Sequence, residues 1–155
     1  MLDELGLAAA VRWYAGGFQK RSGIMVSIET PALPRLPQDI EMTLFRVVQE
    51  GLANVHRHSG SPEARISFVH QPDRIELEIA DKGRGNSNPI APPVNHTLGV
   101  GIPGMRLRVQ QLGGTLEFKS AGDGSTLRVA IPRATASVET SPASAGLDAI
   151  RLSSR

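Results

Sequence analysis

A set of polar side chains recurs at helical spacing in the segment from residue 37 to about residue 58. Glu50, Asn54, Arg57 and His58 are four, three and one positions apart, so in a helix they share one stripe. An amide oxygen suits Mg²⁺, a guanidinium can meet phosphate, and a carboxylate can hold or polarise a nucleophile. A solvated polar face has the same spacing, so spacing alone leaves both interpretations open.

The second candidate is Asp81, which follows a predicted strand. Ile75, Leu77 and Ile79 alternate with other residues, and Asp81 has the same parity as this apolar face. A carboxylate that points inward needs a hydrogen-bond donor, and an adenine amino group is such a donor. An aspartate that simply begins a turn fits the same pattern, so parity alone leaves the choice open.

Glycines mark the third candidate region. Gly83 and Gly85 permit close approach of the backbone to a flat ligand, or a positive φ. Gly99, Gly101 and Gly104 lead into a helix whose free N–H groups would form an anion site. Their G-x-G-x-x-G spacing does not follow a strand, so the context of a dinucleotide-binding motif is missing. A P-loop sequence is absent as well.

The elements that would position these residues follow from periodicity and from turn residues. We predict, in chain order, a helix over 5–21, a strand over 24–29, a helix over 37–58, strands over 64–70 and 74–80, a helix over 103–112, and strands over 115–120 and 125–131. Residues 83–98 have no periodicity, and such long stretches inside a domain are usually lids or binding loops. The order of elements predicts an α+β fold, a two-layer α/β sandwich.

Composition excludes several classes of protein. The 155 residues, 40% of them hydrophobic, suit one domain with a core. The net charge of +2 comes from scattered basic residues, so no nucleic-acid partner is expected. There is no cysteine for disulfides, no apolar stretch of the roughly 20 residues that would span a bilayer, and no signal peptide at the start. We therefore expect a cytoplasmic domain that makes no membrane contact.

Taken in order, the motifs resemble the ATP-binding domain shared by sensor histidine kinases, type II topoisomerases, the MutL repair proteins and the heat-shock ATPase chaperones, the GHKL superfamily. The asparagine box matches residues 50–59, and three glycine boxes match residues 81–85, 99–106 and 122–126. Any one box is a weak signal, but four in the right order and spacing are specific. The resemblance implies the Bergerat ATP-binding fold, with a mixed sheet covered on one face by helices.

Three segments narrow the resemblance further. They are similar to the corresponding segments of the histidine kinase subfamily that pairs with NarL/LuxR-type response regulators. In this chain they read LFRVVQEGLANVHRHSG, GMRLRVQQLGG and LDELGLAAAVRWYAGGF. By this likeness, residues 23–132 form the ATP-binding domain, and residues 1–22 form a helical segment that follows a missing dimerisation domain with the phosphoacceptor histidine. Residues 133–155, rich in Ser, Ala and Thr, are expected to form a disordered tail.

The resemblance also assigns roles to the candidate residues. Asn54 would be the Mg²⁺ ligand, and Glu50 the catalytic residue beside the transferred phosphoryl group. The remaining ATP-binding roles fall to Arg57 and His58 near the phosphates, Asp81 at the adenine amino group, Gly83 and Gly85 in the adenine pocket, Gly99, Gly101 and Gly104 in the lid and phosphate cradle, and Thr126 at the adenine end. Lys82, Pro103 and Leu107 depart from the usual pattern, and none of them removes a predicted ligand.

The implied function is that of a protein histidine kinase in two-component signalling. It would bind Mg²⁺-ATP and transfer the γ-phosphoryl group to a histidine on a separate or missing dimerisation domain, from which the group passes to the receiver domain of a response regulator. The activity would need that phosphoacceptor domain. Two alternatives stay open, namely a serine protein kinase of the anti-sigma-factor type with the same fold, and a non-catalytic ATP-binding interaction module.

Overall fold

The computed structural model describes residues 1–83 and 101–133. In chain order its elements are α1 (Leu2–Ser22), β1 (Met25–Glu29), α2 (Gln38–Asn54), the π-helix η1 (Val55–Ser59), β2 (Glu63–His70), β3 (Arg74–Asp81), α3 (Gly101–Gln111), β4 (Thr115–Ala121) and β5 (Gly124–Pro132). The strands form one sheet in the order β1-β2-β3-β5-β4, in which β1 is parallel to β2 and the other neighbours are antiparallel.

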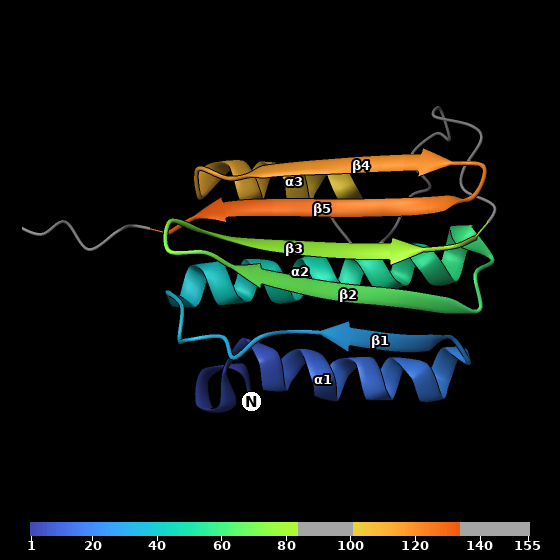
Figure 1. Cartoon of the computed structure of the whole chain (residues 1–155), viewed down its shortest axis with the longest axis horizontal. Coiled ribbons are helices and arrows are strands. Elements are labelled where there is room, and N and C mark those ends of the chain that lie inside the picture. The colour runs from blue at the N-terminus through green and yellow to red at the C-terminus, as the bar shows by residue number, and fades with distance from the viewer. Residues whose placement is uncertain (84–100, 134–155) are drawn as a thin grey trace, which may run out of the picture.

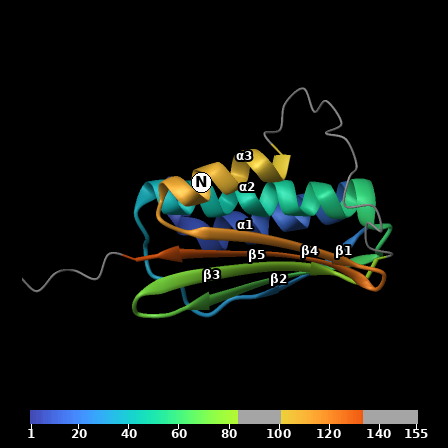
Figure 2. The same cartoon turned by 90° about the horizontal axis from the view of Figure 1, so that it is seen from above.

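The described helices all cover the same face of this sheet (Figure 1; Figure 2). The arrangement is the two-layer α+β sandwich with a mixed sheet that the sequence predicts, so the fold prediction is confirmed. Every predicted helix and strand is present, with ends shifted by no more than about three residues, a scale at which helix and strand definitions differ. The predicted tail and most of the predicted lid, with Gly85 and Gly99, lie outside the described residues.

One element differs in kind from the prediction. The long helix predicted to reach about residue 58 is α-helical only to Asn54 and continues as the π-helix η1. In a π-helix the backbone bonds run from i to i+5, which rotates the residues that follow relative to an α-helix. The α-helical spacing predicted for residues 55–58 is therefore wrong. Such π turns are rare in proteins, and a large share of those that are known lie at functional sites.

The core lies between the sheet and the helices. Ile75, Leu77 and Ile79 of β3 are paired with buried apolar residues of β5 and face the helix layer. Helix α2 supplies the opposing side chains, among which Leu44 and Leu52 are fully buried. Burial of one such side chain stabilises the fold by roughly 1.5–3 kcal/mol.

The other face of the sheet is open and charged. Glu78 of β3 accepts hydrogen bonds there from Arg65 on β2 and from Arg128 on β5. Side chains of even-numbered residues in β3 therefore point away from the helices, as the alternation of burial along this strand also indicates. This distinction between the two faces decides which residues of β5 can reach a site under the helices.

Gly51 allows α2 to approach the sheet closely. A Cβ atom at this position would lie 2.5 Å from Cδ1 of Ile79 and 3.3 Å from Cδ2 of Leu127. A side chain here would therefore force Ile79 to repack or the helix to shift away from β3 and β5. The close approach brings the end of α2, one turn later, against the ends of the central strands.

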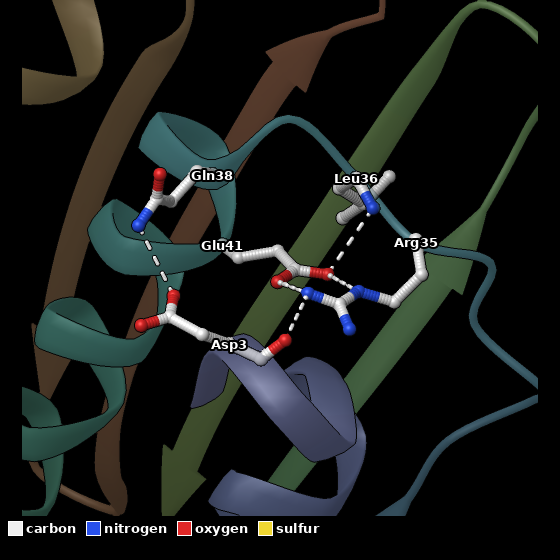
Figure 3. A network of polar contacts seen from close by, with 5 residues as sticks. All are labelled: Asp3, Arg35, Leu36, Gln38 and Glu41. Carbon is white, nitrogen blue, oxygen red and sulfur yellow. Dashed lines mark hydrogen bonds and ion pairs between the residues drawn. The ribbon is translucent and has the colours of Figure 1, made fainter. Parts of the chain in front are cut away.

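A buried carboxylate ties the start of α2 to the first turn of α1 (Figure 3). Glu41 is only 1% exposed. Its Oε1 accepts hydrogen bonds from Nε of Arg35 at 3.2 Å and from the backbone N–H of Leu36 at 3.1 Å. Nη2 of Arg35 also donates to the carbonyl oxygen of Asp3, and Gln38 donates to the carboxylate of Asp3. The network fixes the loop before α2 against the N-terminus of α1.

We expect the substitution Glu41→Ala to lower the free energy of unfolding by about 2–3 kcal/mol, because it leaves the N–H of Leu36 unpaired in a buried place. Urea denaturation measures the change. The matched control is Glu117→Ala, since the exposed pair of Glu117 and Lys119 should contribute less than about 1 kcal/mol. Equal losses in the two variants would contradict a stabilising role for the buried network.

Candidate functional site

A pocket lies where the C-terminal end of α2 meets the central strands. Its lining residues are Gly51, Asn54, Val55, Ile79, Asp81, Phe118, Ser125 and Leu127. Figure 1 shows the end of α2 and the end of β3 at the same end of the sandwich. Two candidates from distant parts of the sequence, Asn54 and Asp81, therefore line a single pocket.

Asp81 ends β3 with its side chain on the buried face of the strand, and it is 9% exposed. Its Oδ1 accepts a hydrogen bond from the backbone N–H of Gly83 at 2.9 Å, and its Oδ2 accepts one from the hydroxyl of Ser125 at 2.5 Å. The first bond is that of an aspartate turn, while the pocket lining shows the inward orientation. Asp81 thus both begins the turn and points into the pocket, and the two bonds fix the carboxylate in one orientation. Its contact with an adenine amino group stays a prediction.

The hydroxyl that reaches Asp81 belongs to Ser125, not to Thr126. The register of β3 and β5 pairs Asp81 with Ser125 and Ala80 with Thr126. Directly opposed residues point to the same face of a sheet, so Thr126 lies on the open face with Ala80. Ser125 also lines the pocket, whereas Thr126 does not, so the role predicted for Thr126 at the adenine end stays a prediction.

Asn54 is the last residue of α2 and lines the pocket with a half-buried side chain. It stands one turn after Gly51, whose close contact with the sheet holds this part of the helix. Its amide offers one neutral oxygen to a ligand or cation. Among the residues that the structure describes, no three His, Asp or Glu side chains come together as a metal-binding cluster.

Glu50 and Arg57 form an ion pair beside the pocket. Nη1 of Arg57 lies 3.7 Å from Oε1 of Glu50, and the side chains are 40% and 15% exposed. The pair shows that these two candidates are neighbours, although Glu50 is on the α-helix and Arg57 is on the π-helix. His58 is exposed on the same π-helix. None of the three is among the residues that line the pocket, so they stand at its side and not in its wall.

Tyr14 of α1 is a neighbour of this ion pair that sequence reasoning did not single out. Its ring packs edge-on against Phe45, with 5.8 Å between the ring centres. Burial raises the pKa of the Tyr14 phenol, and the nearby charges of Arg21, Glu50 and Arg57 act on the same pKa with smaller and partly opposing effects. The phenol is neutral at neutral pH even without this shift, so it offers a hydrogen-bond donor near Glu50 and Arg57.

Two glycines bring backbone segments together around Asp81. A Cβ on Gly124 would lie 2.1 Å from the carbonyl oxygen of Asp81, and one on Gly83 would lie 2.1 Å from the carbonyl oxygen of Ser59. Gly124 also has a φ of +146°, which side chains rarely adopt. Both glycines are therefore needed for the chain to close around the end of β3.

The remaining glycine candidates are divided between described and undescribed parts of the chain. Gly101 begins α3 with a φ of +63°, and Gly104 lies in the first turn of that helix. Neither lines the pocket formed by the described residues. Gly85 and Gly99 lie outside the described residues, so their predicted roles stay predictions.

Phe118 is an aromatic wall residue that the sequence analysis missed. The register pairs it with Leu127, so its ring is on the helix side of the sheet, and it lines the pocket. It is 39% exposed, whereas Leu116 and Leu127 on the same face are buried. An exposed aromatic ring among buried aliphatic residues offers a flat apolar surface to a ligand.

No helix in residues 1–83 and 101–133 combines the length and the apolar character needed to cross a membrane.

The sequence of this chain matches one family model and several known proteins. The family model described as "Histidine kinase-, DNA gyrase B-, and HSP90-like ATPase" matches residues 39–135. The signal transduction histidine-protein kinase/phosphatase UhpB of Salmonella typhimurium is 36% identical over 137 residues, which are 85% of this chain and 26% of that protein. A second relative, the signal transduction histidine-protein kinase/phosphatase DegS of Brevibacillus brevis, is 30% identical over 84% of this chain and 33% of its own length. The chain thus spans about a quarter to a third of these relatives.

Solved structures match in fold. The histidine kinase domain of a blue-light activated histidine kinase from Erythrobacter litoralis aligns with a TM-score of 0.66 and 23% identity, over 82% of this chain and 61% of that one. The histidine kinase AdeS of Acinetobacter baumannii aligns with a TM-score of 0.60 and 19% identity, over 83% of this chain and 64% of its own. The two-layer sandwich is therefore the fold of these domains.

Proposed function

Because this chain belongs to the family of histidine kinase-, DNA gyrase B- and HSP90-like ATPases, we propose that it binds Mg²⁺-ATP in the pocket between α2 and the central strands. It then presents the γ-phosphoryl group to a histidine on a separate domain. Its relatives in sequence are named as signal transduction histidine-protein kinases, which supports this direction of transfer. The chain covers only part of those relatives, so the accepting histidine belongs to a further domain in this proposal.

One observation carries the proposal: Asn54 and Asp81 line the same pocket. A nucleotide has a base with hydrogen-bonding edges at one end and a polyanion that needs a cation at the other. Asp81 offers acceptor oxygens on a rigid carboxylate for an adenine amino group. Phe118 and Ile79 supply apolar surface between the polar groups.

The donor chemistry of Asn54 fits Mg²⁺. This cation takes oxygen ligands, keeps several waters, and is usually held by one or two protein groups together with substrate phosphates. Asn54 offers one such oxygen at the pocket wall. When bound, Mg²⁺ neutralises charge that develops on the transferred phosphoryl group.

The residues beside the pocket have positioning and electrostatic roles in this proposal. Phosphoryl transfer depends mainly on alignment and charge stabilisation, since the protein performs little covalent chemistry. Arg57 and His58 on η1 supply the cationic and donor groups for the phosphate oxygens in this proposal. Glu50, in contact with Arg57, holds or polarises the incoming imidazole.

Calorimetric titration with ATP tests the metal assignment. For the unchanged chain we expect tighter ATP binding in the presence of Mg²⁺ than in EDTA. The substitution Asn54→Ala should remove most of this difference, an effect of about ten-fold in the dissociation constant for one lost charge-assisted contact. The control is Gln49→Ala, which removes an amide side chain from an earlier position of the same helix, outside the pocket lining.

Two results would refute the assignment in different ways. An undiminished Mg²⁺ effect in the Asn54 variant would remove Asn54 as the ligand while leaving nucleotide binding intact. A chain that binds no ATP under either condition would overturn the proposed function itself.

The proposed partners follow from the same kinase class. The phosphoryl group passes from ATP to a histidine domain and then to a response regulator, for which we propose the NarL/LuxR type because of the three segments that resemble kinases of that subfamily. We place this step in the cytoplasm, where ATP is available.

A further inference from the structure

The two walls of the pocket meet where residues 59–63 contact residues 82–83, a region called the joint below. The proposed chemistry gives this region no role. One wall ends with η1 and the turn over residues 59–63, and the other ends with β3 and the residues that follow it. The register pairs Ala64, at the start of β2, with Asp81. Two serines of the turn, Ser59 and Ser61, are each only 4% exposed. Buried hydroxyl groups at this place must be accounted for by their hydrogen bonds.

A chain of hydrogen bonds through these serines connects the two walls. The hydroxyl of Ser59 donates to the carbonyl of Val55 at 3.0 Å and accepts from the N–H of Ser61 at 3.0 Å. The hydroxyl of Ser61 donates to the carbonyl of Glu63 at 2.7 Å and accepts from the N–H of Glu63 at 3.3 Å. It also accepts from the N–H of Lys82 at 3.4 Å, the longest of the set. Lys82, which follows Asp81, is thus linked through Ser61 to Ser59 of the π-helix η1.

Close backbone packing reinforces the joint. The position of a Cβ on Gly83 would be 2.1 Å from the carbonyl oxygen of Ser59, so the two backbones are in direct contact. An ion pair between Lys82 and Glu63 also spans the joint at 3.1 Å. Both partners of this pair are exposed, so the hydroxyl bonds and the glycine contact hold the geometry.

We propose that Ser59 and Ser61 are positioning residues, which set the separation between the Asn54 wall and the Asp81 wall for a ligand that must touch both. The inference rests on the proposed function, in which ATP spans the pocket from its base to its phosphates. A bridging ligand gains affinity when its two contact points are held at the right separation, because less ordering is left for the binding step. A fragment that touches one wall gains nothing from the separation.

The chain contains a matched control for this pair. Ser22 ends α1 with the same two bonds as Ser59, since its hydroxyl donates to the carbonyl of Phe18 at 2.8 Å and accepts from the N–H of Ile24 at 3.1 Å. Helix α1 contributes no residue to the pocket lining. Ser22→Ala therefore removes the same kind of helix-end hydroxyl away from the joint.

The test compares Ser59→Ala and Ser61→Ala with Ser22→Ala, using three probes in the presence of Mg²⁺: ATP, adenosine and inorganic tripolyphosphate. NMR titration gives the dissociation constants, and thermal unfolding measures the loss of stability. We expect either joint variant to weaken ATP by about ten-fold, the equivalent of one lost buried hydrogen bond. Adenosine and tripolyphosphate should change by less than about two-fold, because a looser joint leaves each single-wall contact intact. Ser22→Ala should change none of the three.

Gly83→Ala provides a second variant that acts on the joint from the other side. Its Cβ would push Gly83 away from Ser59, so ATP affinity should fall while tripolyphosphate binding stays within about two-fold. Adenosine is not used as a probe for this variant, because the N–H of Gly83 also holds the Asp81 carboxylate. Unchanged ATP affinity in the joint variants, an equal loss for all three probes, or the same loss in Ser22→Ala would overturn the inference. These results are distinct from a failure of the proposed function, in which the unchanged chain itself binds no ATP.

Discussion

Replacement of Asp81 by asparagine is expected to weaken the binding of ATP about one-hundred-fold, as measured by calorimetry at constant Mg²⁺. The carboxylate accepts hydrogen bonds on both oxygens, from the N–H of Gly83 and from the hydroxyl of Ser125. An asparagine keeps only one oxygen. The N–H of Gly83 cannot reverse, whereas the hydroxyl of Ser125 can turn to accept, so the amide nitrogen takes the place of the oxygen beside Ser125.

In the Asp81→Asn variant, the amide N–H group would face the adenine amino group, which is also a donor. The adenine amino group would then meet an N–H group in place of an acceptor, and two unpaired donors remain in a buried place. Inosine triphosphate carries a carbonyl where ATP carries the amino group, so the same variant should lose its preference for ATP over the inosine nucleotide. The control is Asp73→Asn, the same change in the turn before β3 at the opposite end of that strand. Unchanged affinity and unchanged preference in the Asp81 variant would rule out the assignment of Asp81 to the base.

The second large effect is expected for Glu50→Gln, which should slow phosphoryl transfer by about 10²–10⁴ while ATP binding stays within a few-fold. Glu50 lies beside the pocket and contacts Arg57. In the proposed mechanism, removal of its charge takes away the group that polarises the nucleophile, but leaves Asn54 and Asp81 in place. The measurement is the rate at which radiolabelled phosphate moves from ATP to a separately produced histidine domain of a kinase of the same class. The matched control is Glu117→Gln on the exposed surface of β4.

The same assay separates the kinase alternatives. A Glu50 variant with the rate of the unchanged chain would exclude a catalytic role for Glu50. Acid-stable phosphoserine on a protein partner, without acid-labile phosphohistidine, would favour a serine kinase of the same fold. Tight ATP binding without transfer to either residue would favour a nucleotide-binding interaction module.

The order of elements and the face of Asp81 could be predicted because both depend on local periodicity. Alternation in β3 places Ile75, Leu77, Ile79 and Asp81 on one face, and the structure keeps that parity to the end of the strand. The helix that carries Asn54 was equally clear from its apolar stripe. Local patterns of this kind need no knowledge of the neighbouring strand.

Other features depend on contacts that no local pattern contains. Ser125 and Thr126 are adjacent hydroxyl residues, and the register of β5 against β3, a strand distant in the sequence, decides which one opposes Asp81. Glu41, an acidic residue in the first turn of a helix, looks like a partner for the helix dipole. Its burial follows from Arg35 in the preceding loop. The π-helix η1 interrupts the α-helical period after Asn54, so a search for that period in the sequence could not find it.

The pocket is assembled from three separate stretches of the chain, 51–55, 79–81 and 118–127. No contiguous peptide contains it, and it comes into being only when the central strands have paired beneath α2. The nucleotide proposed for this pocket would therefore bind the native chain and not the unfolded one, and a concentration one hundred times its dissociation constant would add about 2.7 kcal/mol to the free energy of unfolding. The midpoint of thermal unfolding should therefore rise with the concentration of the nucleotide, since no single stretch of sequence contains the whole pocket.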